Sequence, residues 1–62
     1  MSDLFPVDLL VMIDEVRREI AQRRNVYARM VSAHQMNPRT ATRRIEIMEA
    51  LLAKLEAERR AQ

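Results

Sequence analysis

The 62-residue chain contains no glycine, no cysteine and no tryptophan, and only two prolines. Without cysteine it can form neither a disulfide nor a thiolate metal site, and a single histidine makes an imidazole zinc site implausible. No nucleophile is paired with a base, and no carboxylate pair stands apart from neighbouring arginines. We therefore predict a non-enzymatic protein with no catalytic residue, no metal and no cofactor.

Long apolar runs are also missing. The longest, Leu9 to Ile13, is too short to cross a bilayer, so we expect no membrane partner. The opening residues, MSDLFPVD, lack the basic segment of a secretion signal. The expected localisation is therefore cytoplasmic.

The residues that are present favour helices. Ala, Leu, Met, Arg and Glu dominate, and runs of β-branched or aromatic residues are absent. Asn37 is a preferred helix N-cap, and Pro38 suits the first helical position. His34 or Gln35 must turn the chain without glycine, at some strain. We predict an all-α, antiparallel two-helix hairpin over 8–62, with helices near 8–33 and 38–60, a turn at 34–37 and an N-terminal extension at 1–7.

Apolar residues recur at steps of three and four in both predicted helices, which is typical of a bundle seam. Pairing around the turn places Tyr27 near Ile45 and Ile20 near Leu52. A chain this short is marginally stable alone, and the stripes are wider than one hairpin can bury. We therefore expect a homo-oligomer, most simply a homodimeric four-helix bundle, with Leu4 and Phe5 capping the open end or docking on a partner. The predicted oligomer interface contains Leu10, Ile13, Ile47, Leu51 and Leu55.

Charge is unevenly distributed. Between Ile20 and Ile45 there are six arginines and no acidic residue, so a hairpin would be basic at its turn end. One interpretation is a solvated, ion-paired layer, with Glu19 four residues before Arg23 in the favourable order. The other is a surface for a partner or an anion, using arginines near a helix N-terminus. The candidate partner- or anion-binding residues are Arg23, Arg24, Tyr27, Arg29, Arg39, Arg43 and Arg44.

The segment from Arg18 to about Leu55 resembles a group of very short proteins encoded by bacteriophages and prophages. Their pattern has the form E-x-A-x-R-x-x-V-Y-x-R-x-V, a short turn with Met, then I-x-x-M-E-A-I. The matching residues here are Glu19, Ala21, Arg23, Val26, Tyr27, Arg29, Val31, Met36, Ile45, Met48, Glu49 and Ala50. At the turn, where the group tends to have glycine, this chain has His34. The resemblance implies a helical hairpin of phage origin, and no reaction.

Two functions remain open at this point. The first is a phage-type interaction protein that self-associates and binds a host or phage protein, which it would inhibit or redirect. The alternative is nucleic-acid or nucleotide binding through the arginine-rich turn end. Few aromatic side chains and two long helices are unlike a single-strand binder or a helix-turn-helix protein.

Overall fold

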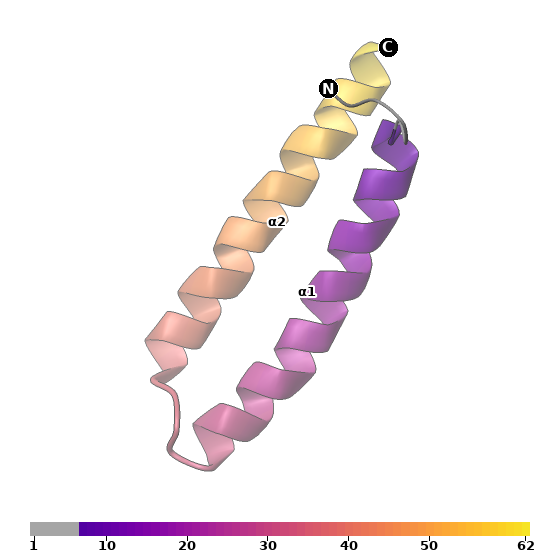
Figure 1. The fold of residues 1–62 in the computed structure, drawn as a ribbon. Helices are drawn as coiled ribbons and strands as arrows, with labels where there is room; N and C mark the ends of the chain where they lie inside the picture. The colour runs from indigo at the N-terminus through magenta and orange to yellow at the C-terminus, as the bar shows by residue number, and fades with distance from the viewer. Residues whose placement is uncertain (1–6) are drawn as a thin grey trace, which may run out of the picture.

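The protein is a hairpin of two long helices. A computed structural model describes residues 7–62, in which α1 (Leu9–Ser32) and α2 (Pro38–Ala61) run antiparallel and are joined by one short connection. The start of α1 and the end of α2 lie at the end opposite the connection (Figure 1). The predicted all-α hairpin is confirmed. The predictions for Leu4 and Phe5 concern residues outside the described range.

Helix α1 begins one residue later than predicted. Asp8 is the N-cap with extended backbone, and its side chain accepts a hydrogen bond from the Val11 N–H at 3.0 Å. Asp8 therefore lies just before the first turn and not within it. A capping carboxylate satisfies a helix N–H that has no partner in the helix and favours the positive end of the helix dipole.

The connection closes α1 with a Schellman motif built on histidine. His34 has a φ of 59°, in the left-handed region that glycine usually occupies. Its N–H donates to Val31 O at 3.0 Å, and the Gln35 N–H donates to Met30 O at 2.8 Å. The strain expected at residues 34–35 is therefore concentrated at His34.

Helix α2 begins where the sequence predicts. Asn37 is the N-cap, Pro38 occupies the first turn, and the Asn37 side chain accepts a hydrogen bond from the Arg39 N–H at 2.8 Å. Proline costs nothing there because that N–H would have no helical partner. Asn37 and Pro38 therefore end the connection and start α2, which runs back antiparallel to α1.

The hairpin has a very small core. Among the described residues only Ile13 and Ile20 are buried, with 3% and 7% of their surface exposed. The other seam residues, including Tyr27, Ile45 and Leu52, are half-buried between the helices. The molecule is a slim body with extents of 42 × 24 × 17 Å. Neither helix has the combination of length and apolarity that crossing a membrane requires.

The left-handed turn residue makes the first prediction. Replacing His34 with glycine should raise the free energy of unfolding by roughly 0.5–1 kcal/mol, because glycine occupies positive φ without a Cβ clash. The control is Gln35→Gly, because Gln35 directly follows His34 but does not have a positive φ. It should be neutral or destabilising. Urea unfolding of both variants measures the difference, and equal effects would contradict the assignment of strain to His34.

Candidate interaction surfaces

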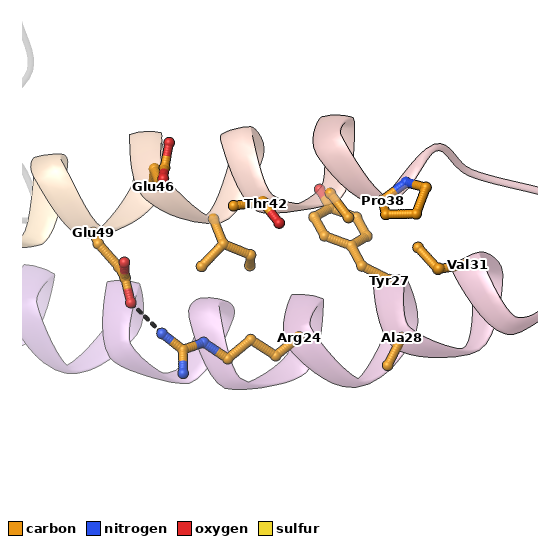
Figure 2. A pocket seen from close by; sticks show the side chains of 10 residues that line it. Arg24, Tyr27, Ala28, Val31, Pro38, Thr42, Glu46 and Glu49 are labelled. Atoms are coloured by element: carbon orange, nitrogen blue, oxygen red, sulfur yellow. Dashed lines mark hydrogen bonds and ion pairs between the residues drawn. The ribbon is translucent and has the colours of Figure 1, made fainter.

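The two helices present two long faces, which are distinguished by the side chains that flank the seam. On one, Arg17 pairs with Glu56, with 2.6 Å between Nη2 and Oε2, and Arg24 pairs with Glu49. We call this the ion-pair face (Arg17, Arg24, Glu49 and Glu56). Figure 2 shows the Arg24–Glu49 pair spanning the helices beside Tyr27. Both pairs imply the same antiparallel register, one residue from the pairing of Tyr27 with Ile45.

The opposite flank of each helix is apolar. At about 100° per residue, positions 12, 19 and 26 of α1 lie across the seam line from Arg17 and Arg24. On α2, positions 44, 51 and 58 lie across it from Glu49 and Glu56. Exposed or half-buried apolar side chains dominate this flank. We call it the apolar face, and its apolar members are Met12, Val26, Met30, Ile47, Met48, Leu51 and Leu55.

One ion pair lies within the apolar face. Arg23 Nε donates to Glu19 Oε2 at 2.8 Å, and these side chains are the pair with the lowest combined exposure among those of residues 7–62. The hydrogen bond to Glu19 raises the pKa of the Arg23 guanidinium above its ordinary value. The four-residue spacing in the sequence predicts this pair. It gives the apolar face a charged layer that is satisfied within one helix.

The structure divides the predicted oligomer residues. Ile47 and Leu51 are large exposed apolar side chains, with 54% and 44% of their surface accessible, and Leu55 is half-buried. Ile13 has 3% of its surface exposed, because it is already buried between the helices of its own chain. Leu10 is 45% exposed but lies with Arg17 and Glu56 at the open end, on the ion-pair face. It therefore cannot share a contact surface with Leu51.

Four of the predicted arginines, Arg29, Arg39, Arg43 and Arg44, lie toward the turn end, and Arg23 and Arg24 lie near the middle of the hairpin, so the six do not form one surface. Arg23 and Arg24 are engaged with Glu19 and Glu49, and Arg43 lies 3.7 Å from Glu46. The other three, Arg29, Arg39 and Arg44, make no ion pair with any residue from 7 to 62. Their spacing places them around the outside of both helices, so they create a broad positive end and no closed pocket for an anion.

A shallow groove of about 610 Å³ lies on the ion-pair face near the turn end. Tyr27, Val31 and Ile45 contribute apolar surface to it, and Arg24, Glu46 and Glu49 line it as well. The Tyr27 ring points from α1 toward α2, close to Pro38 (Figure 2). The groove is wide open to solvent, so it lacks the enclosure that small-molecule sites use to bury a ligand.

The Arg17–Glu56 pair was not predicted from the sequence. The signal was available, because extending the register of Arg24 and Glu49 by two turns toward the open end brings Arg17 level with Glu56.

In comparisons with known proteins, no family model, no curated protein and no solved structure matches this chain. The likeness to short phage proteins therefore stays a prediction.

The ion-pair face makes the second prediction. Arg24→Glu should lower the free energy of unfolding by roughly 1 kcal/mol, because it replaces an attraction to Glu49 with a repulsion, and adding Glu49→Arg should restore most of it. The matched control is the exposed pair within α1, Glu15 and Arg18, 3.5 Å apart. Its reversal should show weaker coupling. Thermal unfolding in low salt measures both cycles. Equal coupling would mean that Arg24–Glu49 adds nothing to helix pairing.

Proposed function

We propose that this chain is a non-enzymatic interaction protein that works as a self-associated helical hairpin. The observation that carries the proposal is the apolar face, where Ile47 and Leu51 are about half exposed while the core of the chain contains two buried residues. A single hairpin cannot bury this surface, because all of its seam positions are already used by the other helix. A second surface of the same kind would remove it from water.

Self-association also explains how so short a chain remains folded. Domains of this size bury about 60% of the surface that their unfolded chains expose, and they are marginal even then. With Ile13 and Ile20 the only buried residues from 7 to 62, this part of the chain has less core than a compact domain of similar length. In an obligate oligomer the missing core forms between chains, so that folding and assembly are one reaction.

The third prediction tests the apolar face directly. Leu51→Glu should shift an assembly to free 7.3 kDa chains in sedimentation or light scattering at micromolar concentration, because it places a charge on the buried surface. Leu10→Glu is a closely matched control, since Leu10 is equally exposed but lies on the ion-pair face. It should leave the oligomer intact.

Two results would contradict the proposal. A wild-type chain that is folded and monomeric at micromolar concentration would remove self-association altogether. Equal loss of assembly in the Leu10→Glu and Leu51→Glu variants would move the contact away from the apolar face. Circular dichroism of each variant reports whether helix content falls together with assembly.

The partner of the assembled hairpin is best sought among proteins. The basic turn end offers Arg29 and Arg39, which have no ion pair among residues 7–62, and a broad positive surface suits an acidic protein surface. Tyr27 is half-buried in the seam and is the one aromatic residue in this range, so stacking on bases gains little. The resemblance to short phage proteins favours a host or phage protein, inhibited or redirected by the contact.

The fourth prediction concerns this partner. Affinity capture from bacterial lysate should recover a protein with the wild-type chain and lose it with the Arg39→Glu, Arg43→Glu double variant, which reverses charge at the turn end. The control, Arg59→Glu with Arg60→Glu, makes the same change in net charge at the open end and should retain the protein. Equal capture by both variants would exclude the turn end as the binding surface.

A mobility-shift assay with the wild-type chain tests the nucleic-acid alternative. We expect no mobility shift of duplex DNA or of single-stranded RNA at low salt. A shift that weakens steeply as salt is added, by roughly 0.9 in log affinity per log salt for each phosphate neutralised on a duplex, would replace a protein partner with a nucleic acid.

A further inference from the structure

We propose that a second copy of this chain packs on the apolar face in the antiparallel orientation, about a two-fold axis at the level of Ala21 and Leu51. Each basic turn end would then lie beside the open end of its partner. The inference rests on the proposed self-association and adds to it the partner's direction and register. It follows from how side chains are arranged along each helix.

The side chains of α1 are arranged symmetrically about Ala21. Glu19 and Arg23 lie two residues on either side of it, and Met12 and Met30 lie nine residues on either side. In a two-fold contact, residue i of one copy meets residue j of the other while j meets i. An antiparallel copy of α1 centred on Ala21 therefore places Glu19 level with the partner's Arg23, and methionine level with methionine.

The side chains of α2 show the same symmetry about Leu51. Ile47 and Leu55 lie four residues on either side of it, and Arg44 and Glu58 lie seven residues on either side. Arg44 and Glu58 fall on the same side of α2 as Leu51, so all three border the apolar face. An antiparallel copy of α2 places Arg44 opposite Glu58 of the other chain, twice in each dimer, and brings the two Leu51 side chains together.

A single axis satisfies both helices because their centres are at the same height. Arg24 pairs with Glu49 and Arg17 with Glu56, and this register sets Ala21 opposite position 52 of α2. Leu51 is one residue away, which is about 1.5 Å along the helix. Two independent symmetric arrangements therefore coincide at one level of the hairpin. Neither pattern is needed for the hairpin itself.

The parallel alternative fails on charge. It would bring the two turn ends together, and with them two sets of four arginines (Arg29, Arg39, Arg43 and Arg44), beside which each chain contributes the acidic residue Glu46. The antiparallel arrangement keeps these ends at opposite ends of the bundle. A face about 42 Å long and 24 Å wide is large enough to bury the roughly 800 Å² per partner of a standard interface.

The experiment uses two variants, each of which introduces a charge repulsion into its own homodimer. Arg44→Glu places a glutamate against the partner's Glu58, and Glu58→Arg places an arginine against the partner's Arg44, so each should weaken self-association about tenfold. In an equimolar mixture the two variants can form a heterodimer. In it the glutamate introduced at position 44 faces the arginine introduced at position 58, and the remaining Glu58 faces the remaining Arg44. The mixture should therefore assemble more tightly than either variant alone, with an affinity within about threefold of the wild-type chain.

Matched controls make the result specific to orientation. Arg43→Glu changes the neighbouring residue, which points about 100° away from Arg44, and should restore the assembly of Glu58→Arg much less than Arg44→Glu does. Leu51→Cys should form a disulfide-linked dimer under mild oxidation, because the two copies of this residue meet at the axis and the chain has no other cysteine. Circular dichroism confirms that each variant remains helical.

The outcomes separate this inference from the function on which it rests. Rescue in the mixture together with Leu51→Cys cross-linking supports the antiparallel dimer. Wild-type self-association without rescue and without the cross-link overturns the orientation while leaving the oligomer intact. A monomeric wild-type chain overturns both. Rescue of Glu58→Arg by Arg43→Glu to the same extent would reduce the effect to net charge and would also overturn the proposal.

Discussion

The structure depends on one geometric constraint, the reversal of the chain between Ser32 and Pro38. His34 accepts a left-handed conformation, and Asn37 with Pro38 starts a new helix immediately afterwards. These residues bring α1 and α2 side by side in a register that buries Ile13 and Ile20 and aligns Arg17 and Arg24 with acidic partners. That register determines which side chains of α1 and α2 lie together on each long face and at each end of the molecule.

The small core of the hairpin explains why so much apolar surface stays exposed on the single chain. Two buried isoleucines cannot by themselves offset the conformational entropy of ordering some fifty residues, so the apolar face is the natural place for the missing burial. In the proposed dimer, the charged groups within that face, Glu19 and Arg23, contribute little to stability but restrict which orientations of the second copy are acceptable. Under this proposal, apolar area drives association and the charged groups select its geometry.

Much of the fold was predictable from local chemistry. Helix periodicity, the Asn37 cap, the position of Pro38 and the pairing of Glu19 with Arg23 depend on neighbours in the chain, and each is found as expected. Predictions about surfaces were less successful. Periodicity grouped Leu10 with Ile47 and Leu51 and left Ile13 available to a partner, because it reports an apolar stripe without saying which part of it the other helix covers.

The sequence by itself determined two helices, their bounds to within one residue, and the arginine-rich segment around the turn, because these follow from residue type and spacing along one chain. Only the tertiary structure decided which flank of α1 lies beside which flank of α2. That choice depends on which residues of each apolar stripe the packing places on the seam, because two antiparallel right-handed helices with a given seam can bring only one pair of flanks together. It places Leu10 on the ion-pair face and leaves Leu51 on the apolar one.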